Sequence, residues 1–248
     1  MTANNTFVWT DLSTFDLAMA RADYAQLFSW AYQEDPSYSF AFLGEAEVAA
    51  LFPMPQRLVD INMPSFWMSY IQVEQLEAVV QQAGTHAGVI VEVAPEEFGE
   101  DARIALVRDP SGAGFTLYEG PDLAPPSQQI GAVTARYHHV DDLGKIEPFY
   151  RDLFGWEFVP NNQQPWPVFD ILHRDGSVVG QAEEVPETIR GTFRYWMPGF
   201  LVGSVEATVR QLNARGGGAS AALTQGRQIV CDQQGAHFII QEQPGAIA

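Results

Sequence analysis

The stretch that decides the fold occurs twice, because Leu27-Phe28-Ser29-Trp30 returns as Leu153-Phe154-Gly155-Trp156, 126 positions later. Two further landmarks follow each stretch in the same order, at offsets of 129 and 123 positions. They are Trp67–Val73, which returns as Trp196–Val202, and Asp109–Ala113, which returns as Asp232–Ala236. Three landmarks in one order predict two copies of a single domain.

A polar, Pro-rich segment separates the copies. Residues 121–129 contain Pro121, Pro125 and Pro126 and show no hydrophobic periodicity, which is typical of a linker. We therefore expect domain 1 over residues 1–120, the linker over 121–129 and domain 2 over 130–248. A chain of 248 residues is long enough for two domains of ordinary size.

Each copy divides again into two similar modules. A strand-like segment opens each module, and a helical pattern of apolar residues follows it. Ser13 and Thr14 are candidate N-caps of the first helix, Gly84 is a candidate C-cap of the second, and Ser204 is a candidate N-cap of the fourth. Further strand-like segments follow each helix. The sequence therefore predicts four strand–helix–strand–strand–strand (βαβββ) modules and an α+β fold with mixed sheets.

The composition limits the classes of partner. The formal net charge is −18, with 13 basic and 31 acidic residues, which disfavours nucleic acids and anionic membranes. The single cysteine, Cys231, excludes an internal disulfide. No apolar run approaches the ~20 residues of a membrane helix, and the N-terminus lacks the pattern of a secretory signal. We expect a cytoplasmic monomer or homodimer whose partner is a small organic ligand.

The module order and the landmarks resemble the glyoxalase / bleomycin-resistance / extradiol-dioxygenase superfamily, also called the vicinal oxygen chelate superfamily. The resemblance rests on Asp142-Leu143, Phe149-Tyr150, Leu153–Trp156 and Asp109–Ala113, and it covers nearly the whole chain. It implies two tandem glyoxalase-like domains with curled sheets, each forming a cup. The superfamily contains isomerases, dioxygenases and non-catalytic drug-binding proteins, so the fold alone does not give the activity.

Enzymes of this superfamily hold a divalent metal with His, Gln or Glu ligands from four strands of the cup. The resemblance places non-ligand residues at the six positions that can be aligned, namely Trp9, Met68, Thr116, Ala135, Met197 and Ile239. Indole and alkyl groups do not coordinate, and a thioether suits soft ions. We expect no metal at these positions and no cofactor.

The alternation of side chains along a strand predicts which residues face the cups. The predicted ligand-binding set is large, apolar and aromatic, which is typical of a small-molecule pocket. It comprises Trp9, Asp11, Phe66, Met68, Tyr70, Thr116 and Tyr118 in the first copy, and Tyr137 and Met197 in the second. Ordinary core packing would give the same pattern, and a structural homologue with filled cups remains an alternative.

The second copy also offers imidazoles at cup-facing positions. His139 and His237 share the inward parity, and Asp170 lies on a neighbouring strand. A histidine pair beside a carboxylate could move a proton near neutral pH. The rival hypothesis is therefore a lyase- or isomerase-type enzyme, metal-free or with a shifted metal site, in which His139, His237 and Asp170 are catalytic.

Overall fold

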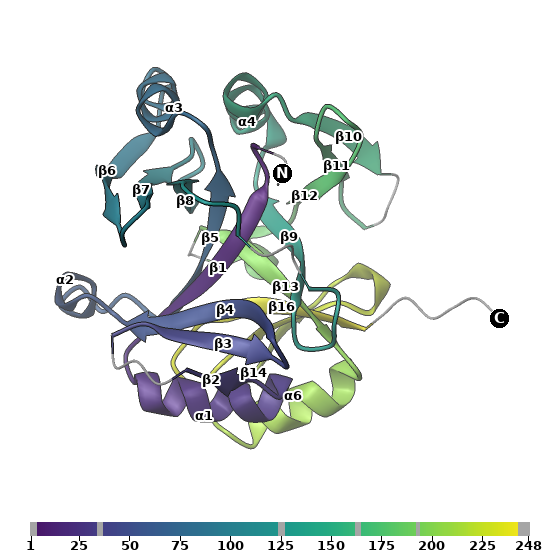
Figure 1. Cartoon of the computed structure of the whole chain (residues 1–248). Coiled ribbons are helices and arrows are strands. Elements are labelled where there is room, and N and C mark those ends of the chain that lie inside the picture. Colours follow the sequence, from purple (N-terminus) through teal and green to yellow (C-terminus); the bar gives the residue numbers. More distant parts are fainter. Residues whose placement is uncertain (1–3, 34–36, 124–126, 162–164, 192–193, 243–248) are drawn as a thin grey trace. The chain divides into compact units, whose positions relative to one another are not determined.

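The computed structural model describes residues 4–33, 37–123, 127–161, 165–191 and 194–242 (Figure 1). It contains the predicted strand–helix–strand–strand–strand module four times, so the predicted α+β class is confirmed. The first copy comprises β1 (Phe7–Thr14), α1 (Leu17–Phe28), β2 (Ala31–Tyr32), β3 (Ser39–Leu43) and β4 (Ala46–Pro53), then β5 (Phe66–Gln72), α3 (Leu76–Ala83), β6 (Ile90–Phe98), β7 (Ala102–Arg108) and β8 (Gly114–Glu119).

The second copy repeats this order. It comprises β9 (Val133–Val140), α4 (Glu147–Phe154), β10 (Glu157–Asn161), β11 (Val168–Leu172) and β12 (Val178–Glu184), then β13 (Trp196–Val202), α6 (Val205–Asn213), β14 (Gly218–Ala222), β15 (Gln228–Cys231) and β16 (His237–Glu242). Short helical turns connect these elements: α2 (Gln56–Val59), η1 (Leu143–Lys145), α5 (Glu187–Arg190) and η2 (Thr224–Gly226).

Each copy supplies one eight-stranded mixed sheet. The strand orders are β2-β3-β4-β1-β5-β8-β7-β6 and β10-β11-β12-β9-β13-β16-β15-β14. In each module the first and last strands pair in parallel, as in β5–β8 and β9–β12, whereas the intervening hairpins are antiparallel. The sequence pattern did not reveal β2 and β10, because β2 has only two residues and Pro160 interrupts β10.

The chain forms two compact units, and each combines segments of both copies. Unit 1 contains residues 1–9, 68–125 and 135–196, and unit 2 contains residues 10–67, 126–134 and 197–248. The boundaries 1–120 and 130–248 describe the copies in the sequence and stay a prediction for domains. Residues 124–126 of the expected linker lie outside the described residues.

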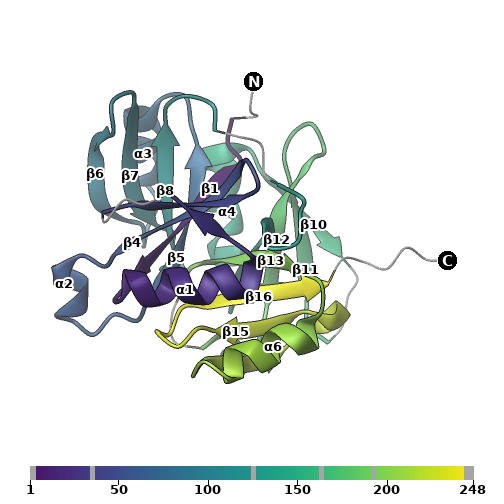
Figure 2. The same ribbon diagram turned by 60° about the horizontal axis from the view of Figure 1, so that its bottom comes forward.

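Each unit contains its own hydrophobic core between sheet and helices. In unit 1, α3 and α4 lie side by side (Figure 1), and Phe115, Tyr150 and Trp196 are fully buried in the core beside them. In unit 2, α1 and α6 lie side by side (Figure 2), and Tyr24, Trp67 and Phe238 occupy the corresponding core. The large apolar residues that recur in both copies therefore fill two equivalent hydrophobic cores.

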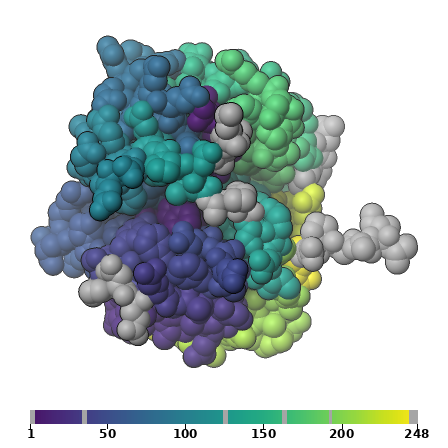
Figure 3. Space-filling view, in the orientation of Figure 1, coloured from purple at the N-terminus to yellow at the C-terminus, as the bar shows by residue number. Residues whose placement is uncertain are grey.

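Strand β6 remains largely exposed at the edge of its sheet. Ile90 is 54 % and Val91 is 37 % exposed, and the β6–β7 hairpin is visible in blue and teal at the upper left of Figure 3. Glu92, Glu96 and Glu97 place charges along this edge, which disfavours pairing with another strand. Among the described residues, no helix has the length and apolar character needed to cross a membrane.

Polar side chains fix where the helices begin. Asp16, not Ser13 or Thr14, caps α1, since its carboxylate accepts a hydrogen bond from the Met19 N–H at 2.9 Å. The predicted N-caps Ser13 and Thr14 are therefore wrong and lie two or three residues too early, because β1 extends through Thr14. Ser204 caps α6 and Gly84 ends α3, as the sequence predicts.

The repeated Leu-Phe-x-Trp stretch marks a left-handed helix end. Ser29 ends α1 at φ 60° and Gly155 ends α4 at φ 70°, so the third residue of the stretch reverses the chain direction in both copies. The following tryptophan is then buried, and its indole N–H donates to a backbone carbonyl, from Trp30 to Gly131 and from Trp156 to Asn5. The stretch thus ends a helix and places a buried tryptophan in the core.

We predict that Gly155→Ala lowers the free energy of unfolding by about 1–2 kcal/mol, the cost of a side chain in the left-handed region. Gly84→Ala is the matched control, since Gly84 also ends a helix but has φ −64° and room for a Cβ. This control should be neutral or stabilising by up to about 1 kcal/mol. Urea denaturation of both variants measures the difference, and equal losses would contradict the assignment.

Candidate functional site

A group of aromatic and apolar side chains gathers on one face of β5, β8 and β7 in unit 1. In the parallel β5–β8 pair, Tyr70 lies opposite Thr116 and Gln72 lies opposite Tyr118. Alternate residues of a strand share a face, so Met68, Tyr70 and Gln72 project to the same side. We name as the aromatic cluster Val8, Trp9, Met68, Tyr70, Phe98, Ala102, Ile104, Tyr118 and Leu123.

The aromatic cluster is buried at its base and partly exposed at its margin. Tyr70 and Tyr118 are buried, whereas Trp9, Met68 and Phe98 keep part of their surface in solvent. The cluster is separate from the helix-side core of unit 1, which contains Phe115 and Tyr150. It is therefore a second apolar surface of the same unit and not an extension of the main core.

Few polar groups accompany this apolar surface. The Tyr118 hydroxyl donates to the Pro121 carbonyl at 3.1 Å. Burial and, to a smaller extent, the charge of Asp122 raise the pKa of Tyr118. Thr116 Oγ1 and Gln72 Oε1, on the same sheet face, are buried and have no hydrogen-bond partner among the described residues. Buried oxygens of this kind are expensive unless another group bonds them.

The structure brings together four members of the predicted ligand-binding set, Trp9, Met68, Tyr70 and Tyr118. Thr116 lies beside them on β8, fully buried. Tyr137 is buried on β9 of the same unit. The remaining three belong to unit 2: Asp11, whose Oδ2 accepts from the Tyr38 hydroxyl at 3.1 Å, with Phe66 and Met197. Ligand binding by all nine stays a prediction.

The six positions of the family metal site divide between the units. Trp9, Met68, Thr116 and Ala135 lie in unit 1, and Met197 and Ile239 lie in unit 2. Thr116 and Ile239 are completely buried, and Met197 is 6 % exposed. In the part of the chain that the structure describes, no group of three or more His, Cys, Asp or Glu side chains is arranged to hold a metal ion.

Among the predicted catalytic residues, His139 lies on β9 with a carboxylate from the adjacent strand. Glu183 of β12 is its cross-strand neighbour, and the His139 Nε2–Glu183 Oε1 distance is 4.0 Å. Both side chains are almost completely buried, and the Trp166 indole N–H donates to Glu183 Oε2 at 2.8 Å. Glu183 was not singled out from the sequence, although its pairing with His139 places both side chains on the same sheet face.

Asp170 occupies β11 in the same unit and is held by amides. Asn161 and Gln181 both donate to its carboxylate, the latter at 2.7 Å. The register Asp170–Gln181–Tyr137 places Asp170 on the sheet face that also carries His139, two residues along β9 from Tyr137.

His237 begins β16 in unit 2, where its Nδ1 lies 3.0 Å from the Gly235 carbonyl and donates to it. The predicted meeting of His139 and His237 therefore involves two units and stays a prediction.

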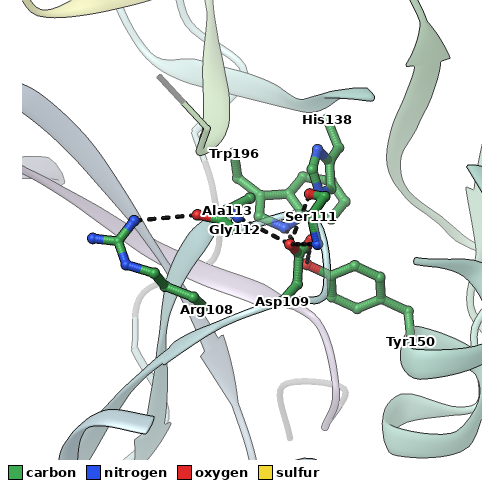
Figure 4. A network of polar contacts seen from close by, with 8 residues as sticks. All are labelled: Arg108, Asp109, Ser111, Gly112, Ala113, His138, Tyr150 and Trp196. Carbon is green, nitrogen blue, oxygen red and sulfur yellow. Dashed lines mark hydrogen bonds and ion pairs between the residues drawn. The ribbon is translucent and has the colours of Figure 1, made fainter. Parts of the chain in front are cut away.

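A denser polar network lies behind β9, on the helix side of unit 1 (Figure 4). The carboxylate of Asp109 accepts hydrogen bonds at one oxygen from the Ser111 N–H and hydroxyl and from the Ala113 N–H. At the other oxygen it accepts from His138 Nε2 at 2.6 Å and from the Tyr150 hydroxyl at 3.0 Å. Tyr150 in turn accepts from the Trp196 indole at 2.7 Å.

The electrostatics of this network favour an ionised aspartate. Burial acts to raise the pKa of Asp109, but the charge and hydrogen bond of His138 and the bonds from Ser111 and Ala113 together hold it below its usual value. Asp109 is completely buried, so no substrate can reach it in this structure. The network therefore serves structure and not direct chemistry.

Unit 2 contains a smaller version of this network, without the imidazole and without the serine hydroxyl. Asp232 accepts from the Gln234 and Ala236 N–H groups and from the Tyr24 hydroxyl at 2.9 Å. Leu12 stands where the repeat places His138 in the other unit. Burial is accordingly the dominant influence, and it raises the pKa of Asp232. The pKa shifts of the two aspartates therefore have opposite directions, and His138 is the largest influence that lowers the pKa of Asp109.

Sequence reasoning found the Asp109 and Asp232 turns as landmarks but missed their link to the tyrosines and to His138. The available signal was the alternation of side chains along β9. Since His139 faces the cup, the preceding His138 faces the opposite side of the sheet.

We predict that His138→Leu, which copies the residue of unit 2, lowers the free energy of unfolding at pH 7 by about 3–5 kcal/mol, because it leaves a buried carboxylate without its imidazole partner. The lowered pKa of Asp109 contributes stability above the ordinary carboxyl pKa near 4. This stability is lost as the pH falls through the pKa of the folded state. The deficit of the variant should therefore shrink below about pH 4. Urea denaturation at several pH values measures it.

The matched pair Asp109→Asn and Asp232→Asn tests the opposite shifts. Because the pKa of Asp232 is raised in the folded state, its contribution to the free energy of unfolding is complete below the ordinary carboxyl pKa. That contribution is lost as the pH rises through the pKa of the folded state. At pH 7 we therefore expect Asp232→Asn to cost less than Asp109→Asn. Equal costs would contradict the role of His138.

Comparisons with known proteins agree on the fold. No family model matches the chain. Proteins named "Putative glyoxylase CFP32" from Mycobacterium bovis and Mycobacterium tuberculosis are 28% identical over 251 aligned residues, which cover 94% of this chain and 92% of theirs.

Two solved structures illustrate the likeness. The Mn(II)-bound glyoxalase from Novosphingobium aromaticivorans has a TM-score of 0.61 at 10% identity, covering 100% of this chain and 90% of that one. The 2,2',3-trihydroxybiphenyl 1,2-dioxygenase from Sphingomonas wittichii has a TM-score of 0.62 at 11% identity, covering 97% and 91%. The resemblance seen in the sequence is confirmed: the chain has the tandem fold of the glyoxalase / extradiol-dioxygenase, or vicinal oxygen chelate, superfamily.

Proposed function

We propose that this protein binds a small apolar or aromatic organic molecule at the aromatic cluster, without the metal ion of its structural neighbours. The observation that carries the proposal is the gathering of Trp9, Met68, Tyr70 and Tyr118 into one cluster apart from the main core. The alternation of side chains along three strands predicts this group without any structure.

The composition of the cluster suits such a ligand. Small-molecule sites are mostly apolar and contain a few polar groups that orient the ligand. Trp9, Met68 and Phe98 are partly exposed and offer apolar contact area. Thr116 Oγ1 and Gln72 Oε1, on the same sheet face, accept no hydrogen bond from the part of the chain that the structure describes. A ligand with one donor group would find both apolar contact and a hydrogen-bond acceptor there.

The residues at the family metal positions do not fit a divalent ion. Hard or borderline cations such as Mn(II) take carboxylate, imidazole or water ligands. In unit 1 those positions carry an indole, a thioether, a hydroxyl and a methyl group, at Trp9, Met68, Thr116 and Ala135. The chemistry proposed for this chain therefore includes no metal-bound step.

An enzyme is the second candidate, and the His139–Glu183 pair favours it. An imidazole close to a carboxylate, on the same sheet face as Asp170, is an arrangement that can move protons. His237 remains part of this hypothesis as predicted from the sequence. Mass spectrometry of incubated ligands distinguishes the candidates, because a binding protein leaves them unchanged. A protein with filled cups would bind none.

The acidic composition supports the expectation that nucleic acids and anionic membranes are not partners. A cytoplasmic monomer or homodimer stays a prediction.

We predict that Met68→Ala weakens the binding of 1-naphthalenemethanol at least fivefold, because the variant removes part of the proposed contact surface. Met19→Ala is the control, since Met19 lies exposed on α1, outside the aromatic cluster. It should leave binding unchanged. Titration followed by tryptophan fluorescence measures both. Loss of binding in Met19→Ala alone would place the site elsewhere.

We also predict that purified protein contains no stoichiometric zinc, iron or manganese, because the aligned positions carry no competent ligand. Elemental analysis and thermal unfolding with and without a chelator measure this. About one ion per chain, whose removal lowers the melting temperature, would overturn the metal-free part of the proposal.

A further inference from the structure

A buried amide at one end of the aromatic cluster has an acceptor oxygen that the described residues do not satisfy. Gln72 is 5 % exposed and lies on β5 opposite Tyr118, a member of the cluster. Met68, Tyr70 and Gln72 alternate along β5, so the amide projects to the cluster side of the sheet. Among the described residues, no donor reaches its Oε1. A buried acceptor without a donor is costly, and a bound molecule can supply that donor.

The nitrogen of the same amide makes only long contacts. Gln72 Nε2 lies 3.5 Å from the Gly120 carbonyl and 3.4 Å from Asp122 Oδ1. Both distances exceed the usual N···O length of about 2.9–3.0 Å. Contacts of this length are readily exchanged for shorter ones. Gln72 therefore keeps hydrogen-bonding capacity at both ends of its amide.

The segment that follows β8 brings a negative charge to this end of the cluster. A Cβ atom at Gly120 would lie 2.6 Å from the Tyr118 hydroxyl and 2.7 Å from the Ala102 Cβ, so the chain passes directly against the cluster. Leu123 belongs to the cluster, and Asp122 precedes it. Besides burial, the charge of Asp122 raises the pKa of Tyr118, as a carboxylate close to that hydroxyl does. We name as the polar end Gln72, Gly120, Pro121 and Asp122.

The polar end offers more acceptors than donors. Its acceptors are Gln72 Oε1, the Asp122 carboxylate and the carbonyls of Gly120 and Pro121. The side-chain donors are the Gln72 amide and the Tyr118 hydroxyl, and the hydroxyl already donates to Pro121. An ammonium group has three N–H donors and no acceptor, and its hydrogen bonds to a carboxylate are stronger than those of a neutral donor. A protonated amine therefore complements the polar end.

The aromatic rings beside the polar end suit the same charge. The faces of indole and phenol rings carry negative potential and attract cations. Tyr70 and Tyr118 flank Gln72 on the two paired strands, and the partly exposed Trp9 belongs to the same cluster. The net charge of −18 also favours the approach of a cation over that of an anion.

We propose that the ligand of the aromatic cluster is an aromatic amine, whose protonated nitrogen is bound by Gln72 Oε1 and the Asp122 carboxylate while its ring lies on the cluster. This inference rests on the proposed function and adds the charge and the orientation of the ligand to it. The ammonium supplies the donor that Oε1 lacks. Because Oε1 is covered in the structure, the amine reaches it when residues 120–123 shift, which breaks only the long Nε2 contacts of Gln72.

The experiment compares 1-naphthylmethylamine, protonated at pH 7, with 1-naphthalenemethanol, by calorimetric titration of the full-length protein. We expect the wild type to bind the amine about tenfold more tightly than the alcohol, or better. Asp122→Asn should reduce this preference to about twofold and leave the affinity for the alcohol unchanged. Gln72→Leu should weaken binding of the amine more than binding of the alcohol. Glu45→Gln, which neutralises an exposed acid between β3 and β4, is the control for net charge and should keep the preference.

The outcomes separate the two proposals. If the wild type binds both probes equally, or if either Asp122→Asn or Gln72→Leu keeps the full preference for the amine, only this inference fails. It also fails if Glu45→Gln loses as much of the preference as Asp122→Asn. If neither probe binds the wild type, the proposed function fails together with it. Should Gln72→Leu not fold, the wild-type preference and its loss in Asp122→Asn decide the question, since Asp122 is exposed.

Discussion

A buried carboxylate that ties a turn to a helix is the interaction on which each unit depends. In unit 1, Asp109 closes its own turn through Ser111 and Ala113 and binds the tyrosine of α4. In unit 2, Asp232 does the same with the tyrosine of α1. The repeated landmarks of the sequence, the Asp-x-x-Gly-Ala turn, the helical tyrosine and the strand tryptophan, therefore meet at a single point in each unit. Their repetition reflects one structural requirement that is met twice.

Local signals allowed much of the fold to be predicted. Caps, periodicity and the repeats specify four modules, and the alternation along β5 and β8 specifies the group of Met68, Tyr70 and Tyr118. Local signals could not show which modules pack together. Nothing in the sequence around either residue indicates that Asp109 of the first copy binds Tyr150 of the second. For the same reason Glu183 was missed as the neighbour of His139, because cross-strand partners depend on register and not on spacing in the sequence.

The two copies share a common frame but differ at many aligned positions. His138 and Leu12 occupy aligned positions, and the pKa of the nearby aspartate is lowered beside the imidazole and raised in the copy that lacks it. Arg136 and Thr10 form a similar pair two residues earlier, where only one copy has a cation. Both differences lie on β9 and its counterpart β1, where the aligned residues of the two copies differ at every position. The opening strands thus differ while the three repeated landmarks are kept.

The interleaved composition of the units has a consequence for how the protein is made. The Tyr24–Asp232 bond joins residues 208 positions apart, and unit 2 includes residues near both ends of the chain. During synthesis on the ribosome, the first 67 residues would emerge long before the partners that cover α1. Contacts of such high sequence separation form slowly, and the nascent apolar surfaces stay exposed in the meantime. The strongly negative charge of the chain would then act as protection against aggregation during its own assembly.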